Sequence, residues 1–376
     1  AIDLKKFDQG EYHESLKVKT EIESINKVLY PQDHNEHGKK LRLVQQYFLV
    51  SAAMQNILNN YFAKHSDPTE LPKYVAVHIN DTHPVLCVPE LMRLLIDKYG
   101  LGWDSAWSVV KQVVSYTNHT ILSEALEVKS LSVIEKVMPR IALIIRELDR
   151  RFRIELGEFF KNDFRKIDSM SIISGDNVYM ANLAIYASHT VNGVAKIHSH
   201  ILKTRLFRDY AEMYPGKFRN ITNGVTHRRW LSQSNEQLDS FIKSLIGDKY
   251  YVTPERLSNL ADFVEDKKVL ATMQEIKFQN KRRFAKFLSE YQKIDIDPES
   301  RFDVQVKRIH EYKRQLLNAM RIIYLMNKIR ENPTENIAPQ VFIFAGKAAS
   351  GYAMAKRIIR LINQIAFEIN SDPLLS

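Results

Sequence analysis

Cationic residues that follow a strand pattern are the part of the sequence with the clearest chemistry. In segment 302–318, FDVQVKRIHEYKRQLLN, the residues Phe302, Val304 and Val306 alternate with polar ones, which predicts a half-buried strand. The chemically active side chains that follow are Lys307, Arg308, His310, Tyr312, Lys313 and Arg314. Lysine and arginine form strong charge-assisted hydrogen bonds with phosphate, so this turn is suited to an anion.

The residues after this turn have the spacing of a helix. Leu316, Met320 and Ile323 repeat at helical intervals, and the helix is predicted to end before Pro333, which lacks a backbone donor. The free N–H groups at a helix start favour an anion, and each cation adds about 1.5–3 kcal/mol. The segment therefore predicts either a phosphate site or a solvated basic helix start.

Two polar loops follow strand patterns earlier in the chain. Residues 73–79 alternate as a strand and lead into the loop 80–84, NDTHP, and residues 112–116 lead into the loop 117–120, TNHT. Ligands bind at the carboxyl ends of strands in open α/β sheets. The candidate ligand-binding residues in these loops are Asp81, His83 and His119. Hydrogen-bonded structural histidines are the alternative explanation.

Three further segments carry turn signals or polar side chains. They are the loop 28–34 with Asp33, the run 188–195 (SHTVNGVA), in which Gly193 permits close backbone approach, and the run 218–230 (FRNITNGVTHRRW) with a turn at Asn223. The histidines near the second segment are His189, His198 and His200. No Cys, Asp or Glu completes a metal site at ligand spacing, so no metal is predicted.

The end of the chain repeats the strand and helix order. A second strand is predicted over residues 340–345, followed by the loop 346–351 and a helix, which together give a parallel sheet. The loop lacks the spacing of a Walker motif. A sheet of only two strands indicates that this domain is incomplete.

Composition indicates an ordinary globular protein. The 376 residues allow two domains, and 45% are hydrophobic and 26% charged. A net charge of +10 suits an anionic partner, but no nucleic-acid-binding motif occurs, so we expect a small anion and no nucleic acid. Cys87 is the only cysteine, which excludes a disulfide framework and favours a cytoplasmic setting. No signal peptide or long apolar span indicates export or membrane insertion.

These segments resemble one known family over most of the chain, from about Phe7 to the C-terminus. Segment 302–318 resembles, almost letter for letter, the phosphate-binding segment of the α-glucan phosphorylases, which act on glycogen, starch or maltodextrin. The resemblance implies an α/β fold made of parts of two Rossmann-like domains of a GT-B-type retaining glycosyltransferase, with parallel sheets flanked by helices. Residues 1–218 would be the later part of the N-terminal domain, and residues 219–376 the early part of the C-terminal domain.

The resemblance also implies an activity and a cofactor. Such enzymes carry out phosphorolysis of α-1,4-glucans with inorganic phosphate and release α-glucose 1-phosphate, and the full-length enzymes are expected to be homodimers. They hold pyridoxal 5′-phosphate as a Schiff base on a lysine of a downstream segment that is not present in this chain. We therefore expect an internal fragment that is inactive alone and does not bind the cofactor covalently.

Site residues are assigned by the same resemblance. The expected catalytic residues are Arg308, Lys307, Lys313 and His119. The expected substrate-binding residues are Asn223, Tyr312, Asp33 of a gate loop, Asp81, His83 and Val194. The expected cofactor-binding residues are Trp230, Lys307 and Lys313. Two other interpretations stay open: a sugar-nucleotide-dependent glucosyltransferase of the same architecture, and a truncated, non-catalytic glucan-binding protein.

Overall fold

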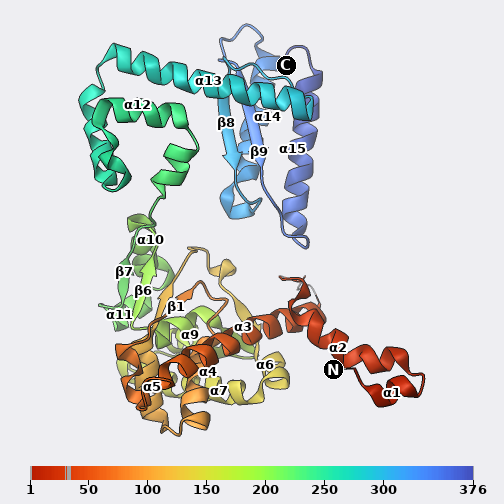
Figure 1. Cartoon of the computed structure of the whole chain (residues 1–376), viewed down its shortest axis with the longest axis vertical. Helices are drawn as coiled ribbons and strands as arrows, with labels where there is room; N and C mark the ends of the chain where they lie inside the picture. The colour runs from red at the N-terminus through yellow and green to blue at the C-terminus, as the bar shows by residue number, and fades with distance from the viewer. Residues whose placement is uncertain (1, 30, 32–34, 376) are drawn as a thin grey trace. The chain divides into compact units, whose positions relative to one another are not determined.

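A computed structural model describes residues 2–29, 31 and 35–375, without the side chain of Glu124. The chain forms two compact units, Ala1–Asn223 and Gly224–Ser376, whose elements are labelled in Figure 1. The domain limits expected from the sequence differ from these units in the assignment of residues 219–223. In both units parallel strands are flanked by helices, so the expected α/β class is confirmed.

The first unit is built on a parallel sheet. Its strands are β1 (Val77–Asn80), β2 (Val114–Thr117), β6 (Thr190–Gly193) and β7 (Phe218–Asn220), which lie in that order. All neighbouring pairs run parallel, as expected when helices connect consecutive strands. A separate antiparallel sheet has the order β3 (Val128–Ser130), β5 (Asn177–Tyr179) and β4 (Ile173–Ser174). The strand expected at 73–79 begins only at Val77, because a 3₁₀ turn precedes it.

Helices supply most of the first unit's core. They are α1 (Leu4–Asp8), α2 (Tyr12–Lys27), α3 (Glu36–Phe62), η1 (Pro68–Lys73), α4 (Cys87–Arg93), η2 (Leu94–Lys98), α5 (Trp103–Val113), η3 (Ser123–Ala125), α6 (Leu131–Val137), α7 (Pro139–Phe159), α8 (Phe164–Met170), α9 (Met180–Ala187), α10 (Lys196–Ile201), η4 (Leu202–Leu206) and α11 (Arg208–Met213). Every residue of α9 is buried, and α4, α5 and α7 contribute many of the other core side chains. This core fixes the strand ends that carry the polar loops.

The second unit has a two-stranded parallel sheet. Its elements are η5 (Arg228–Gln233), α12 (Glu236–Ile246), η6 (Asp248–Tyr251), η7 (Pro254–Phe263), α13 (Lys267–Gln292), β8 (Arg301–Val306), η8 (Glu311–Lys313), α14 (Gln315–Glu331), β9 (Gln340–Ala345) and α15 (Ala353–Ser371). Strands β8 and β9 pair along their whole length. The second strand matches the expected residues 340–345, and α14 ends before Asn332 as predicted.

The buried faces of β8 and α14 differ from those expected. Val304 and Val306 are 57% and 61% exposed, because α14 and α15 pack on the opposite face of the sheet, beside Phe342 and Phe344 of β9. In α14 the buried residues are Gln315, Ala319, Ile322 and Met326, whereas the expected Leu316 and Met320 are exposed. The alternation and the helical period were predicted correctly, but the predicted inner faces were wrong. Among the described residues, no helix is long and apolar enough to span a bilayer.

Candidate active site

The polar loops of the first unit lie at one edge of its parallel sheet. Asn80 at the end of β1 lies beside Thr117 of β2, and Thr117 lies beside Asn192 of β6. Backbone bonds continue this alignment into the loops, from Asp81 N–H to the Thr117 carbonyl (3.1 Å) and from Asn118 N–H to the Asn192 carbonyl (3.0 Å). The loops after β1, β2 and β6 are therefore brought together, as the sequence predicted for the first two.

The turn at Asp81 has a strained backbone. Its φ of 67° lies in the left-handed region, which residues other than glycine rarely adopt. The Asp81 carboxylate accepts the backbone N–H of Thr82 at 2.6 Å, which offsets part of the cost. Such strain persists where the surrounding structure demands the conformation, and it is common at ligand sites.

His119 is exposed in the loop after β2 and is oriented by the last residue of β1. Its Nε2 lies 2.5 Å from Oδ1 of Asn80. Because this contact occupies Nε2, the nitrogen available to a ligand hydroxyl is Nδ1. His119 is therefore exposed at the sheet edge, with its ring orientation set by Asn80.

The segments of Val194 and Asn223 are joined by the backbone. Asn223 N–H donates to the Val194 carbonyl at 3.1 Å, and Ile221 N–H donates to the Gly193 carbonyl at 3.1 Å. The chain after β7 therefore follows the chain after β6. The structure thus places Asn223 beside Val194, two residues that the family resemblance assigned to substrate binding.

Glu127, which the sequence did not single out, is the centre of a charged cluster beside these loops. Its carboxylate lies 2.7 Å from Nζ of Lys129 and 3.4 Å from Nδ1 of His83, and it accepts from Gln46 at 3.1 Å. Burial alone would raise its pKa, but hydrogen bonds from these groups hold the pKa of the Glu127 carboxyl well below its usual range. Gln46 lies in α3, His83 lies in the loop after β1, and Lys129 lies in β3. Glu127 thus ties together three segments that are distant in the sequence.

In the second unit, the cationic segment is held against the loop after β9. Lys307 N–H donates to the Ala345 carbonyl and Ile309 N–H to the Lys347 carbonyl, each at 3.0 Å. Gly346 lies between these bonds. A Cβ there would be 1.9 Å from the Lys307 carbonyl oxygen, so only glycine fits. This contact also brings the loop of Lys347, which the sequence had not joined to the site, beside the cations.

Two glutamines fix the backbone of the same segment. The fully buried Gln315 donates from Nε2 to the Arg308 carbonyl at 2.9 Å and accepts His310 N–H at 3.3 Å. Gln305 donates to the Lys313 carbonyl at 3.0 Å. Sequence reasoning missed both residues because a glutamine in a polar stretch gives no signal of burial.

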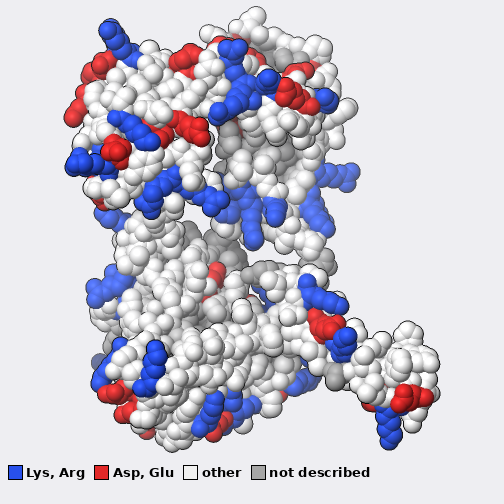
Figure 2. Space-filling view, in the orientation of Figure 1, with Lys and Arg blue, Asp and Glu red and all other residues white. Residues whose placement is uncertain are grey.

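The cationic side chains are offered to solvent. Lys307 and Arg308 are exposed, and Lys313 is half-buried with its Nζ 4.7 Å from the ring centre of Tyr312. In the described part of the chain, no carboxylate forms an ion pair with Lys307, Arg308, Lys313 or Arg314. Figure 2 shows Lys and Arg gathered at the edge where β8 and β9 end. A fixed backbone with unneutralised cations is suited to a phosphate.

We expect Gln315→Met to loosen the cationic segment, because the Arg308 carbonyl and the His310 N–H would lose their buried partner. The cost is about 1–3 kcal/mol of unfolding free energy for the second unit. Denaturant unfolding followed by hydrogen exchange of His310 would measure it. Gln274→Met, at an exposed glutamine of α13, is the matched control and should be near neutral. Equal stabilities of the two variants would contradict the role of Gln315.

Three expected site residues remain to be located: Trp230, Asp33 and Tyr312. Trp230 is 68% exposed in η5, which packs against α12. Asp33 lies outside the described residues. Tyr312 is 53% exposed beside Lys313, and its ring lies 4.6 Å from that of His310.

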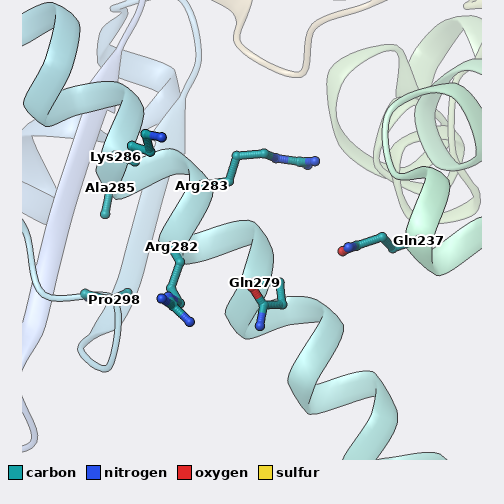
Figure 3. Close-up of a pocket in the computed structure, with 7 residues that line it drawn as sticks. All are labelled: Gln237, Gln279, Arg282, Arg283, Ala285, Lys286 and Pro298. Atoms are coloured by element: carbon teal, nitrogen blue, oxygen red, sulfur yellow. The ribbon is translucent and has the colours of Figure 1, made fainter.

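A cavity of about 540 Å³ lies elsewhere in the second unit, between α12 and α13. Figure 3 shows Arg283 of α13 and Gln237 of α12 directed toward each other across it. The residues that line it include Arg282, Lys286 and Pro298 but none of the expected site residues. Within the described ranges, no group of His, Cys, Asp or Glu is arranged to hold a metal ion.

Comparisons with known proteins identify the family. Residues 1–376 match the family described as carbohydrate phosphorylase. The chain is 45% identical over 358 residues to a glycogen phosphorylase of Bacillus subtilis, covering 95% of this chain and 45% of that protein. It is 43% identical to cytosolic alpha-glucan phosphorylase 2 of Arabidopsis thaliana and 42% identical to the liver form of glycogen phosphorylase of Homo sapiens, each over 99% of this chain.

Those two matches cover 46% and 45% of the relatives, so the chain spans about half the length of the curated proteins it matches. The fold and the loop arrangement are those of an α/β protein consistent with a GT-B-type glycosyltransferase. This chain belongs to the carbohydrate phosphorylase family.

The cofactor that the family implies, pyridoxal 5′-phosphate, fits part of this chain. Its phosphate matches the cationic segment, where Lys307 and Lys313 have no carboxylate partner among the described residues. Lys217 has the low pKa that covalent attachment needs, since burial lowers it to about 7. However, its Nζ donates to the Ile185 carbonyl at 2.8 Å, and it precedes β7, at the end of the sheet opposite to the loops. The cationic segment therefore fits the phosphate of the cofactor, whereas Lys217 does not fit its attachment.

Proposed function

We propose that this chain is the part of an α-1,4-glucan phosphorylase that supplies the glucosyl-binding loops and the phosphate-binding segment. The reaction is phosphorolysis of an α-1,4-glucan, which releases α-glucose 1-phosphate. The observation that carries the proposal is the cationic segment after β8, whose backbone is fixed while its cations keep no carboxylate partner among the described residues. Membership in the phosphorylase family supports it.

The first unit would bind the sugar. His119 offers Nδ1 to a hydroxyl of the transferred glucosyl unit, and Asn223 holds the primary hydroxyl beside Val194. Asp81 and His83 line the approach of the glucan, and Asp33 acts on the gate loop. A small number of well-placed polar groups of this kind orients a sugar in its site.

The second unit would bind phosphate. Arg308 can form a forked pair of bonds with the substrate phosphate, while Lys307 and Lys313 hold the cofactor phosphate and Tyr312 contacts sugar hydroxyls. Trp230 would lie beside the bound pyridoxal 5′-phosphate, and the chemistry that this cofactor would supply is acid–base catalysis by its phosphate. Cations around two adjacent phosphates reduce their repulsion, and the remaining repulsion keeps one of them a usable acid near neutral pH.

Phosphate binding by the 376-residue chain tests the proposal directly. Titration with inorganic phosphate, followed by calorimetry, should show binding that Arg308→Gln weakens about tenfold to a hundredfold, through the loss of one charged hydrogen-bond pair. Arg308→Lys should recover only part of the affinity, because it lacks the forked geometry. Arg301→Gln, at an exposed arginine at the other end of β8, is the control. Unchanged affinity in Arg308→Gln would contradict the assignment.

The complete activity is tested in the longest natural polypeptide that contains this chain. We expect it to release α-glucose 1-phosphate from a maltooligosaccharide and phosphate, in a cytoplasmic homodimer. Glucosyl transfer from a nucleotide sugar without phosphate would instead indicate a sugar-nucleotide-dependent enzyme. Oligosaccharide binding with neither reaction would indicate a non-catalytic glucan-binding protein.

A further inference from the structure

His198 of α10 links two of the loops at the sheet edge. Its Nδ1 accepts the backbone N–H of Val194 at 3.0 Å, and its Nε2 lies 3.2 Å from Oδ1 of Asn118. The side chain is 9% exposed, so both contacts are shielded from water. Val194 follows β6, whereas Asn118 follows β2 and directly precedes His119.

These two contacts determine the protonation of the ring. Oδ1 of Asn118 also accepts Thr120 N–H at 3.0 Å, so it is an acceptor and Nε2 must carry the hydrogen. Nδ1 must be bare, because a backbone N–H points at it. The imidazole is therefore neutral, with its hydrogen on Nε2. A second proton on Nδ1 would face the N–H of Val194, donor against donor.

Close packing of α10 on β6 makes this link possible. A Cβ on Gly193 would lie 2.5 Å from Oγ of Ser199 and 2.9 Å from its Cα, so the helix approaches the strand as closely as glycine allows. Ser199 also donates to Oδ1 of Asn220 at 2.9 Å, which attaches the helix to the end of β7. The histidine is thus held at a fixed distance from both loops.

We propose that His198 is a positioning residue of the glucosyl site, whose neutral imidazole ties the loop of His119 to that of Val194 and whose protonation separates them. Through the Asn223 N–H bond to Val194, the tie extends to a third sugar-binding residue. The inference rests on the proposed function, which assigns these three residues to one glucosyl unit. His198 lies near His189 and His200 in the sequence, where three histidines could be taken for metal ligands. The proposal gives His198 a different role, as a clamp between two loops.

The surroundings keep the ring neutral at ordinary pH. Burial lowers the pKa of His198 below its usual value, and repulsion from His119 on the facing loop lowers it further, while the Thr120 carbonyl acts in the opposite direction. A histidine with a lowered pKa stabilises the fold fully above the unfolded pKa of about 6.5, and this contribution is lost as the pH falls toward the folded pKa. The clamp should therefore hold at pH 7 and open under acid.

The ring state can be measured in the intact chain without any activity. NMR of the ¹⁵N-labelled 376-residue protein should show His198 as the neutral Nε2–H form at pH 7, and the amide signal of Val194 should shift with its protonation. A protonated ring at pH 7, or a neutral ring with its hydrogen on Nδ1, would overturn the proposed clamp. This result would not depend on whether the chain binds a sugar. The exposed His200 of the same helix should show no such coupling.

Substitutions test the link to sugar binding. His198→Phe keeps a ring but loses both bonds, and His198→Asn keeps an acceptor where Nδ1 lies. We expect the dissociation constant for a maltooligosaccharide to rise about tenfold in His198→Phe and less in His198→Asn, with no change in the control His200→Phe.

If protonation of His198 opens the clamp, oligosaccharide binding by the wild type should weaken as the pH falls. This pH dependence should be absent from both His198 variants. Wild-type affinity in folded His198→Phe would overturn the positioning role. A wild-type chain with the expected tautomer but no oligosaccharide binding would instead overturn the glucosyl assignment of the loops, and with it the role of His198 in binding.

Discussion

A Gly346→Ala variant is expected to bind phosphate far more weakly and to have a much less stable second unit. The added Cβ would lie 1.9 Å from the carbonyl oxygen of Lys307 and 2.8 Å from its carbonyl carbon. Both are backbone atoms, so no side chain can rotate away. The segment can escape only by giving up the backbone bonds of Lys307 to the last residue of β9 and of Ile309 to the loop that follows it. Overpacking of this kind with lost backbone bonds costs about 3 kcal/mol.

The measurement is denaturant unfolding of the second unit together with phosphate titration. Gly224→Ala is the control in the same unit, because an added Cβ there meets nothing within 4 Å and the backbone φ is not positive. That variant should be as stable as the wild type. If Gly346→Ala matched it in stability and in phosphate affinity, the close approach of the two loops could not be what positions Lys307 and Arg308.

The sequence predicts where the candidate site residues lie better than it predicts which residues hold them in place. Polar residues after strands predicted that the loops of Asp81 and His119 share an edge, because parallel strands end together. The close approach of Gly193 was also expected from its position in the run 188–195. The buried face of β8 could not be predicted, since alternation gives a period but not the face on which α14 and α15 pack.

The supporting residues leave no local signal at all. Gln315 stands in a polar run, where a glutamine is ordinary. It is buried only because the preceding turn at Arg308 and His310 folds against it. Glu127 joins segments 81 residues and 45 residues away along the chain, which no spacing rule connects. His198 was noticed as a histidine, but its two bonds depend on α10 resting on β6. The roles expected for Tyr312, Trp230 and the other site residues stay predictions.

Replacement of Glu127 by glutamine is expected to be among the most damaging single changes in the first unit. Three basic groups surround this carboxylate: Lys129 at 2.7 Å, His83 at 3.4 Å and Arg42 at 4.0 Å. The Lys129 and Arg42 side chains are only 13% and 24% exposed. Without the carboxylate they repel one another in a poorly hydrated place. Breaking a buried ion pair by removing one partner costs about 3–5 kcal/mol.

A matched control separates this effect from the loss of any glutamate. Glu135 forms an ion pair with Arg146, but both side chains are largely exposed, at 41% and 51%. Glu135→Gln should therefore change the free energy of unfolding by less than about 1 kcal/mol. Denaturant unfolding of the two variants gives the comparison. Similar losses would mean that the Glu127 cluster is no more than a surface ion pair.

The pH dependence of the cluster gives an independent test, because its two titrating members act in opposite directions. The hydrogen bond with Glu127 raises the pKa of His83 against the effect of burial, with Asp81 adding to the rise and Arg42 opposing it. The stability from His83 is therefore complete below about pH 6.5 and lost as the pH rises through its folded pKa. The stability from Glu127, whose pKa is lowered, is complete above about pH 4.3 and lost as the pH falls through its folded pKa.

The cluster should accordingly be strongest between about pH 4.3 and 6.5 and weaken on both sides. In Glu127→Gln the pKa of His83, followed by NMR, should fall, since its main partner has lost its charge. An unchanged pKa would show that Asp81, not Glu127, holds the proton on His83. The loop of Asp81 and His83 would then be set by its own strained turn, and the attachment to α3 through Glu127 would have no part in shaping the sugar-binding edge.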